Sequence, residues 1–536
     1  MIGMSLLMHK TGMVMTANRV HTGGTIGDLI IQAVARYPDR IAFVDDQVKL
    51  TYRQLGERIG RAMSAFSALG VKRGDGVVQL SGNRADVFVV MASAYLMGLR
   101  SVTLHGMGSV EDHAYVISDA EAVFFIADGG YKARLDELRN HCPAVRHWYS
   151  HDSGIAGQES FWDYAAGFDP APLRVSAQPE DVIRLAYTGG TTGKPKGVML
   201  TNRSMWMQAV LLLAARQLPA ELRLICPTPI SHGAGAMLVP TLWRGGTVIL
   251  QRGFDPERYI AALQEYRATF SFLVPTMVYA ILDHPHSKTA DFSSLRLLSY
   301  GASPMAPARI QEAMRVFGPV LVQSYGQTES PSNILFLSQE DHARTDVNTL
   351  GSAGMPYPGV TVELMDDQDN PVEDGQVGEL CVRSPLVMEG YWKQPELTAE
   401  VLRNGWLHTG DMAYRDPEGY YFLVDRKKDM IISGGFNVYP KEIENVLSAH
   451  PAVATAAVIG VPDDKWGEAV KAIVVLRDDV TVSEDELREV VRTAKGPVNT
   501  PKSIEFVDAL PLTTLGKVDK NQLRARYWGD RIRKIN

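Results

Sequence analysis

The strongest constraint on the fold is an alternation of helical and extended apolar patterns that occurs twice along the chain. Within residues 25–130 the helical patterns are 52–69 and 86–97, and the apolar runs that read as strands are 77–80 and 101–104. The same rhythm returns within residues 222–322. Because a strand–helix–strand unit forms a parallel sheet covered by helices, the sequence predicts an α/β fold with two doubly wound sheets.

The pattern changes after Gly351, and this change predicts further units. Short alternating segments rich in Gly, Pro and Asp are typical of an antiparallel β subdomain. A compact α+β pattern follows the charged stretch 425–429. At 536 residues the chain is too long for one hydrophobic core. We therefore expect a large N-terminal domain, residues 1–426, and a small C-terminal domain, residues 427–536.

Charge and composition exclude several classes of protein. The net charge is -7, which gives no general attraction to nucleic acid or to an anionic membrane. The longest apolar stretch, 88–99, is shorter than the roughly 20 residues that a membrane helix needs, so it predicts a core helix. Residues 1–24 show no secretory signal and suggest a loose leader or an uncertain start codon.

The three cysteines, Cys142, Cys226 and Cys381, lack metal-ligand spacing and cannot form a disulfide framework. Idle or buried thiols are typical of a reducing compartment. A cytoplasmic protein is therefore expected.

The sharpest local signal is a segment, 188–197, that holds three threonines and two lysines among four glycines. Glycine-rich backbone lets several N–H groups converge on a phosphate, while hydroxyls add donors and lysines add charge. A Walker A loop requires one more residue between its glycines, and it requires Ser or Thr where Pro195 stands. The segment before it and the run 198–201 after it look like strands, and Asn202 is expected to cap the next helix. The sequence predicts a different phosphate loop, set between two strands.

Four further motifs follow in order at residues 325–329, 405–411, 425–429 and 511–517. Together with the loop, they resemble the acyl-adenylate-forming superfamily, which contains acyl-CoA synthetases, luciferases and peptide-synthetase adenylation domains. The resemblance runs from about residue 25 to 520. It implies a large N-terminal domain, a mobile C-terminal domain, and adenylation of a carboxylic acid by ATP with Mg²⁺, followed by transfer to coenzyme A.

The resemblance also implies roles for individual residues on the nucleotide side. Thr188, Thr191, Thr192 and Lys196 would hold the β- and γ-phosphates. Glu329 would hold Mg²⁺, and Thr328 would contact the α-phosphate. Tyr325 and the segment Gly301, Ala302 and Ser303 would form the adenine slot, while Asp411 and Arg426 would contact the ribose.

The C-terminal residues would serve both half-reactions. Lys517 is the expected catalytic cation, placed near the α-phosphate and the substrate carboxylate. The second step requires Lys517 to leave and a thiol to enter, and Lys428 matches the hinge of that domain rotation. Gly434, Gly435 and Phe436 resemble the loop that lines the pantetheine tunnel.

The acyl pocket is expected at the segment 231–236, where His232, Gly233 and Ala236 match the family's pocket strand. No acidic residue occurs between Ser231 and Trp243, so a substrate ammonium group would be buried without a partner. Amino acids are disfavoured. A gating tryptophan of some long-chain relatives is replaced here by Ala236. Fatty, alicyclic and aromatic acids all stay open.

Three alternatives remain beside a coenzyme A ligase. The same adenylation could deliver to a separate carrier protein or to an oxidative light-emitting reaction; no fused carrier is expected, because the chain ends at Asn536. A non-catalytic nucleotide-binding module would leave Lys517 and Glu329 idle. The partners expected are a small carboxylic acid, ATP and coenzyme A, with a homodimer as a possible assembly.

Overall fold

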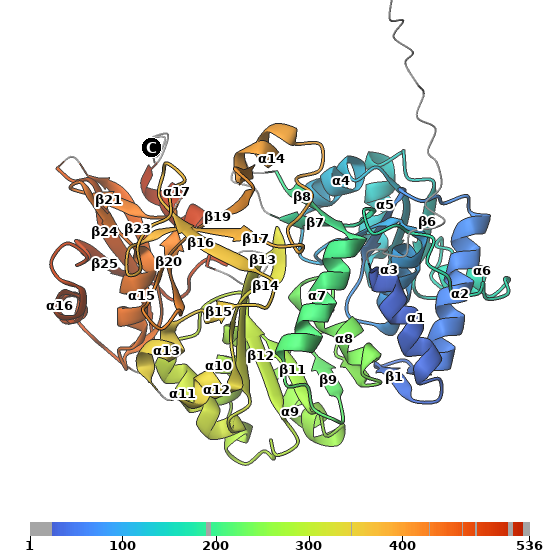
Figure 1. Cartoon of the computed structure of the whole chain (residues 1–536), viewed down its shortest axis with the longest axis horizontal. Coiled ribbons are helices and arrows are strands. Elements are labelled where there is room, and N and C mark those ends of the chain that lie inside the picture. Colours follow the sequence, from blue (N-terminus) through green and yellow to red (C-terminus); the bar gives the residue numbers. More distant parts are fainter. Residues whose placement is uncertain are drawn as a thin grey trace, which may run out of the picture.

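The computed structural model describes residues 24–188, 194–344, 346–427, 429–463, 465–477, 480–512 and 518–528. The elements follow one another across the molecule in Figure 1, from the blue helices of the N-terminal part to the orange and red strands of the C-terminal part. Four sheets organise these elements.

The central sheet is built mostly from parallel strands. Its strands, in spatial order, are β15 (Met355–Pro356), β14 (Ser330–Leu337), β13 (Leu321–Gln327), β12 (Leu297–Gly301), β11 (Phe270–Leu273), β9 (Arg223–Cys226), β10 (Thr247–Leu250), β1 (Ile41–Val44) and β2 (Lys49–Thr51). Its helices are α8 (Leu238–Trp243), α9 (Pro256–Glu265), α10 (Pro275–Asp283), α11 (Pro307–Phe317), α12 (Gln339–Ala343) and α13 (Val347–Gly351). The strand–helix rhythm predicted for residues 222–322 is confirmed.

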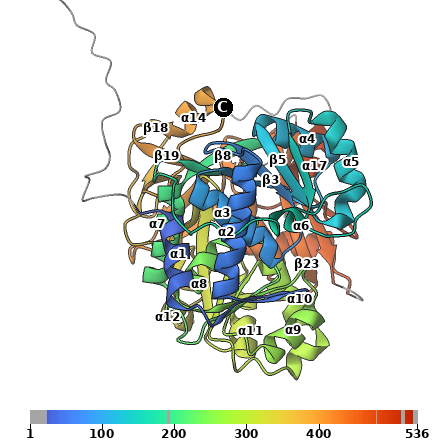
Figure 2. The same cartoon turned by 90° about the vertical axis from the view of Figure 1, so that its right-hand side faces the viewer.

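The flanking sheet carries the first repeat of that rhythm. Its strands, in spatial order, are β6 (His147–Ser150), β5 (Ala122–Ala127), β3 (Gly76–Leu80), β4 (Arg100–Thr103), β7 (Val182–Thr188) and β8 (Lys196–Thr201). The helices around it are α1 (Ile26–Arg36), α2 (Tyr52–Ala68), α3 (Ala85–Met97), α4 (Val110–Asp119), α5 (Lys132–His141), α6 (Phe161–Ala165) and α7 (Asn202–Ala215). Figure 2 shows α4 and α5 beside β3 and β5.

Asn83, at the end of β3, ties the two sheets together. Its Nδ2 donates to the carbonyls of Cys226, Thr228 and Gln251 at 3.2, 2.8 and 3.0 Å. Its Oδ1 accepts from the Ile230 N–H at 2.9 Å. Buried amides are stable only when their donors and acceptors are filled. This residue therefore fixes the loops of the central sheet against the flanking sheet.

The last two sheets are separate from these layers in sequence. The β-subdomain sheet holds β16 (Thr361–Met365), β17 (Gly378–Arg383), β18 (Leu402–Arg403), β19 (Trp406–Arg415) and β20 (Tyr421–Arg426), with α14 (Pro395–Val401) beside it. The C-terminal sheet holds β21 (Ile431–Ser433), β22 (Phe436–Val438), β23 (Val453–Asp463), β24 (Gly467–Leu476) and β25 (Ser503–Phe506), with α15 (Pro440–Ser448), α16 (Glu484–Lys495) and α17 (Lys520–Trp528). The β-subdomain strands pair antiparallel, as the sequence predicts.

The hydrophobic core follows the same division. One large cluster runs from Ile26 to Tyr421 and joins the first three sheets. Two smaller clusters contain only residues from Ile431 onward. The proposed domain boundary after Arg426 stays a prediction, although the separate clusters lie on its two sides.

Two helix ends show their local geometry clearly. Gly70 follows α2 with a φ of +70°, a conformation that glycine adopts readily after a helix end. The interpretation of Asn202 as a helix cap is wrong. Thr201 caps α7, because its side chain accepts from the Ser204 N–H, and Asn202 is the first helical residue. The Asn202 Oδ1 instead accepts from the Ile26 N–H at 2.8 Å, a contact that local sequence cannot reveal.

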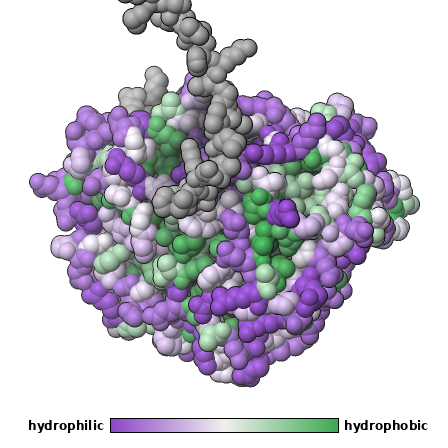
Figure 3. All heavy atoms as spheres, turned by 45° about the vertical axis from the view of Figure 1, so that its right-hand side comes forward, coloured by the Kyte–Doolittle hydropathy of each residue, from purple (hydrophilic) through white to green (hydrophobic). Residues whose placement is uncertain are grey.

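The predicted core helix and buried thiols are confirmed. Every residue of α3 from Ala85 to Leu96 is buried. Cys142, Cys226 and Cys381 are free and buried. Within the described part of the chain, no helix is long and apolar enough to cross a membrane. Figure 3 shows hydrophilic side chains around the rim of one face, with hydrophobic patches nearer its middle.

Candidate active site

The predicted phosphate loop joins two antiparallel strands of the flanking sheet. Thr188 at the end of β7 lies opposite Lys196 at the start of β8. The placement between two strands is therefore confirmed, while Thr191 and Thr192 lie outside the described residues. The Thr188 Oγ1 is buried and has no hydrogen-bond partner among the described residues. Such a buried hydroxyl suits an anionic ligand, because an unfilled donor is costly.

Lys196 and Glu329 meet through a tyrosine that the sequence reasoning missed. The Lys196 Nζ donates to the Tyr391 hydroxyl at 2.6 Å, and that hydroxyl donates to the Glu329 Oε1 at 2.7 Å. The Lys196 Nζ also lies 3.9 Å from the centre of the Tyr391 ring and 3.6 Å from the Glu329 Oε1. The hydroxyl thus bridges a cation and a carboxylate that also lie within ion-pair distance of each other.

Backbone pairing carries Tyr391 to this place. The Met199 N–H donates to the Gly390 carbonyl at 2.9 Å, and the Trp392 N–H donates to the Gly197 carbonyl at 2.7 Å. The segment around Tyr391 therefore lies along the edge of β8. Its glycine–tyrosine–tryptophan sequence marks it as unusual, but only this long-range pairing assigns it to the phosphate loop.

Thr328 and Glu329 form the turn between β13 and β14, since Gln327 pairs with Ser330. The Met388 N–H donates to the Glu329 carbonyl at 2.9 Å. Glu329 is 9% exposed, so its carboxylate is held away from bulk water. The hairpin tip therefore places one carboxylate beside Lys196, at the start of β8.

Asp411, Tyr325 and Arg426 form a second linked group. The Tyr325 hydroxyl donates to the Asp411 Oδ2 at 2.6 Å, and the Arg426 Nε lies 3.1 Å from the Asp411 Oδ1. Burial and the charge of Asp411 raise the pKa of Tyr325, so its phenol stays a donor. The Asp411 charge likewise raises the pKa of Arg426. The three side chains predicted for adenine and ribose therefore come together.

The segment predicted for the adenine slot lies beside Tyr325. Gly301 ends β12, and a Cβ at this position would lie 2.5 Å from the Ser324 carbonyl oxygen of β13. Ala302 has a φ of +68°, a conformation that costs an alanine energy. Ser303 is half-buried just after this turn. The backbone here approaches β13 as closely as glycine allows.

His232 is held at the start of the predicted acyl segment. Its Nδ1 lies 2.8 Å from the Ser231 Oγ, and its ring lies edge-on to His105 at 5.5 Å. Arg184, on the strand that leads to the phosphate loop, donates to the Ser231 carbonyl at 2.6 Å. Burial, followed by the charges of Arg184 and His105, lowers the pKa of His232 to about 4. The imidazole is therefore neutral at neutral pH.

Gly233 and Ala236 lie on a short 3-10 helix, η3 (Gly233–Met237). A Cβ on Gly233 would lie 3.4 Å from the Phe272 ring. Ala236 is 8% exposed. Small residues here leave an apolar environment next to His232.

The predicted coenzyme A loop lies in the C-terminal sheet. Gly434 and Gly435 have φ values of +60° and +84° and join β21 to β22 in a tight hairpin. The Gly434 N–H donates to the Trp466 carbonyl at 2.8 Å, and a Cβ on Gly434 would lie 2.6 Å from the Trp466 ring. Phe436 is 60% exposed. No hydrogen bond or ion pair between described residues joins this hairpin to Asp411 or Glu329.

Lys428 and Lys517 lie outside the described residues, so their predicted roles stay predictions. Their neighbours are well tied. Lys427 donates its N–H to the Gly410 carbonyl at 2.9 Å. Leu512 and Val518, the described residues on the two sides of Lys517, form an isolated antiparallel β-bridge. Lys520 forms a buried ion pair with Glu444 at 2.8 Å.

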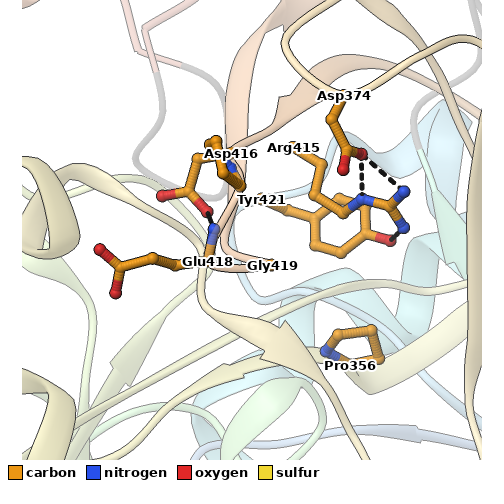
Figure 4. Close-up of a pocket in the computed structure, with 8 residues that line it drawn as sticks. Pro356, Asp374, Arg415, Asp416, Glu418, Gly419 and Tyr421 are labelled. Atoms are coloured by element: carbon orange, nitrogen blue, oxygen red, sulfur yellow. Dashed lines mark hydrogen bonds and ion pairs between the residues drawn. The ribbon is translucent and has the colours of Figure 1, made fainter.

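A cavity of about 350 Å³ lies elsewhere, in the β subdomain. Figure 4 shows Arg415 paired with Asp374 at its wall, at 2.6 Å, with Glu418 and Tyr421 nearby. It contains none of the predicted site residues. Among the described residues no group of three or more His, Cys, Asp or Glu could hold a metal ion.

Comparisons with known proteins identify the family of the chain. Residues 30–392 match the family described as AMP-binding enzyme, and residues 442–517 match the AMP-binding enzyme C-terminal domain. A medium/long-chain-fatty-acid–CoA ligase, FadD8 of Mycobacterium tuberculosis, is 42% identical over 94% of this chain and 90% of its own length. A feruloyl-CoA synthase of Amycolatopsis is 38% identical over 94% of this chain and 99% of its own length.

A solved structure is also similar. The amide bond synthetase McbA from Marinactinospora thermotolerans has a TM-score of 0.86 and 33% identity, covering 94% of this chain and all of that one. Two matched domains, relatives of full length and a shared mixed α/β architecture lead to one conclusion. The chain belongs to the AMP-binding enzyme family.

Proposed function

We propose that this chain is an ATP-dependent acyl-CoA ligase that adenylates an apolar carboxylic acid and transfers the acyl group to coenzyme A. The observation that carries the proposal is the group formed by Lys196, Tyr391 and Glu329 beside the phosphate loop. A cation for phosphate oxygens and a buried carboxylate for a metal lie within one hydrogen-bonded unit. The relatives named above, which include a fatty-acid ligase and a feruloyl-CoA synthase, support an apolar acid.

The residues present fit Mg²⁺. Mg²⁺ is bound through one or two carboxylates together with substrate phosphates and water, so Glu329 alone is a sufficient protein ligand. When bound, the ion would neutralise charge on the phosphates. The unfilled Thr188 hydroxyl and Lys196 would add a donor and a cation from the chain itself.

The chain's own residues account for nucleotide binding in the first half-reaction. Asp411 would accept from the ribose hydroxyls, and Arg426 beside it offsets its charge. Tyr325 would contact the adenine from its position on β13, which its hydrogen bond to Asp411 fixes. The α-phosphoryl group gathers negative charge in the transition state, so a preplaced cation lowers the barrier. We assign that role to Lys517, with Thr328 as a donor.

The acyl side and the second half-reaction complete the proposal. The neutral His232 ring, Gly233 and Ala236 would line the acid beside the carboxylate. Rotation at Lys428 would bring Gly434, Gly435 and Phe436 to the thiol. The Phe436 side chain is exposed beside a tight glycine hairpin. This exposure supports a role for the hairpin in contacting coenzyme A or another part of the protein.

A second acceptor is the alternative, favoured by the similarity to an amide bond synthetase and by a fatty acid–[acyl-carrier-protein] ligase of Streptomyces coeruleorubidus at 32% identity. In that case adenylation is unchanged and the thiol is replaced by an amine or a carrier protein.

The test is an exchange of labelled pyrophosphate into ATP over a panel of fatty, alicyclic and aromatic acids. We expect exchange with at least one acid class, and consumption of the acyl-AMP on adding coenzyme A. If pyrophosphate exchange occurs but coenzyme A does not consume the acyl-AMP, while an amine or a carrier protein does, the acceptor is that amine or carrier protein instead of coenzyme A. No exchange with any acid would overturn the proposal.

A further inference from the structure

Arg216 is a buried arginine whose hydrogen-bonding contacts among the described residues are all with neutral groups. It follows the end of α7 and is 5% exposed. Its Nη2 donates to the Ser324 Oγ at 2.6 Å and lies 3.4 Å from the Tyr357 hydroxyl. Its Nη1 lies 3.4 Å from the Met237 Sδ, a weak acceptor. Its Nε, like that of the buried Arg84, has no hydrogen-bond partner in the described part of the chain, so the distinguishing feature of Arg216 is that the partners of its Nη atoms are all neutral.

A second buried arginine shows what ordinary pairing looks like. Arg84 is 4% exposed and lies 2.9 Å from carboxylate oxygens of both Asp128 and Asp152, with Asp86 at 3.2 Å. No Asp or Glu among the described residues forms an ion pair with Arg216. A buried cation is costly unless it is paired, so Arg84 is explained by structure and Arg216 is not.

The neighbours of Arg216 place it between the two predicted halves of the site. Met237 ends η3, the 3-10 helix that carries Gly233 and Ala236. Ser324 immediately precedes Tyr325 on β13, and its hydroxyl lies 2.8 Å from the Tyr357 hydroxyl. The guanidinium therefore contacts the far end of the predicted acyl segment and the strand under the adenine slot.

We propose that Arg216 determines acid specificity: the acid that this chain activates carries an oxygen acceptor at the end distant from its reacting carboxylate. The inference rests on the proposed function, because it requires that the acid bind along η3. A purely hydrocarbon end would leave the buried Arg216 charge with neutral partners alone, the Ser324 and Tyr357 hydroxyls and the Met237 sulfur. A phenolic or carboxylate oxygen accepts a charge-assisted hydrogen bond, which is the stronger kind.

The residues next to Arg216 also indicate the chemical character of the rest of the acid. Ala236 and Met237 are buried and apolar, so the body of the acid should be apolar. An aromatic acid with a ring hydroxyl and a chain with a second, terminal carboxylate share this chemistry. The same experiment distinguishes them.

The first arm uses the unaltered protein. Steady-state kcat/KM for pyrophosphate release is measured with cinnamate and 4-hydroxycinnamate, and with octanoate and octanedioate. We expect the oxygen-bearing acid of one pair to be preferred by at least about 10-fold, because a site built to donate a hydrogen bond rejects an analogue without the acceptor. The pair that shows the preference identifies the oxygen as a phenolic hydroxyl or as a terminal carboxylate. No preference in either pair would overturn the proposal.

The second arm uses Arg216→Met and Arg216→Lys, with Arg53→Met as a matched control at an exposed ion pair. Arg216→Met should reduce the preference to within about 2-fold, mainly through a higher KM for the oxygen-bearing acid. Arg216→Lys keeps the charge without the planar fork and should retain part of the preference. A preference that survives Arg216→Met unchanged would overturn the assignment.

Failure of this inference is distinct from failure of the proposed function. If cinnamate or octanoate still supports pyrophosphate exchange while the oxygen gives no advantage, the ligase stands and Arg216 loses its role. If no acid supports exchange, the proposed function fails first. Should Arg216→Met not fold, as judged by circular dichroism, the unaltered protein and Arg216→Lys still decide the question.

Discussion

The nucleotide side and the acyl side of the candidate site are built by opposite means. On the nucleotide side four described charged groups have charged or hydroxyl partners: Lys196 and Glu329 share Tyr391, and Asp411 is paired with Arg426. On the acyl side the polar groups are His232, which is held neutral, and Arg216, which has neutral partners.

This difference follows from what each side must recognise. ATP presents the same phosphates and ribose to every member of the family, so preset charge is useful there. Acids differ between members, so the acyl side is set by small residues and by single polar groups. We therefore expect substitutions on the nucleotide side to lower all activity, and substitutions on the acyl side to alter selectivity or pH response.

The largest effect is expected on the nucleotide side, from Lys517→Ala. Loss of a cation placed at the α-phosphate should lower adenylate formation about 100- to 1000-fold, while thioester formation from supplied acyl-AMP stays largely intact. Single-turnover assays of the two half-reactions measure this. Lys132→Ala, at an exposed pair with Asp136, is the control. Equal loss of both steps would contradict the domain-rotation proposal.

Asp411→Asn should have the next largest effect. The amide keeps the shape and one acceptor but loses the charge that Arg426 and the ribose hydroxyls need. Hydrogen bonds to charged groups contribute about 1.5–3 kcal/mol, so the KM for ATP should rise roughly 10- to 100-fold. Asp374→Asn removes a charge from an exposed pair with Arg415 and should leave that KM unchanged. An unaltered KM in the first variant would remove Asp411 from the nucleotide site.

Tyr391→Phe tests the nucleotide side more narrowly, because it removes one hydroxyl and keeps the charges of Lys196 and Glu329. The Lys196 Nζ and the Glu329 Oε1 already lie 3.6 Å apart and should then close to a direct hydrogen-bonded pair, in competition with phosphate and Mg²⁺. We expect the Kd for ATP with Mg²⁺, measured by calorimetry, to rise about 5-fold. Tyr420→Phe, whose hydroxyl contacts Asp341 and Arg344 instead, is the matched control. Equal affinities for ATP in the two variants would show that the Tyr391 hydroxyl does not contribute to nucleotide binding.

The smallest effect is expected on the acyl side, from His232→Gln. The folded-state pKa of His232, about 4, lies below its ordinary value of 6.5. The stabilisation is present above pH 6.5 and is lost as the pH falls toward 4, since the unfolded chain then binds the proton more readily. The variant should therefore lose about 1 kcal/mol less stability than the unaltered protein between pH 7 and pH 5.5. Thermal unfolding at both pH values measures this, and parallel losses would contradict it.

The sequence predicts the architecture well because its signals are local. The spacing of apolar residues in α2 and the short run that forms β3 indicate a helix and a buried strand without any knowledge of neighbours. The antiparallel β subdomain and the strands on both sides of the phosphate loop were predictable for the same reason. The helix cap was misplaced by one residue, because Thr201 and Asn202 are both good caps and only the backbone geometry chooses.

The candidate site divides in the same way. The order of motifs, through the resemblance, predicts that Tyr325, Asp411 and Arg426 act together, and the structure brings them within hydrogen-bonding distance. Tyr391 could not be found by this reasoning. It lies 195 residues from Lys196 and 62 from Glu329, and no local pattern reports a contact over such separations.

The amino-acid sequence by itself determined the α/β rhythm, the phosphate loop and the class of chemistry, because apolar period, glycine content and motif order are properties of neighbouring residues. Only the tertiary structure decided that Tyr391 bridges Lys196 and Glu329, that His232 is neutral and that Arg216 has no carboxylate among the described residues. These depend on burial and on side chains brought together from distant segments, and the free energy of a charge is set by that environment rather than by its neighbours in sequence.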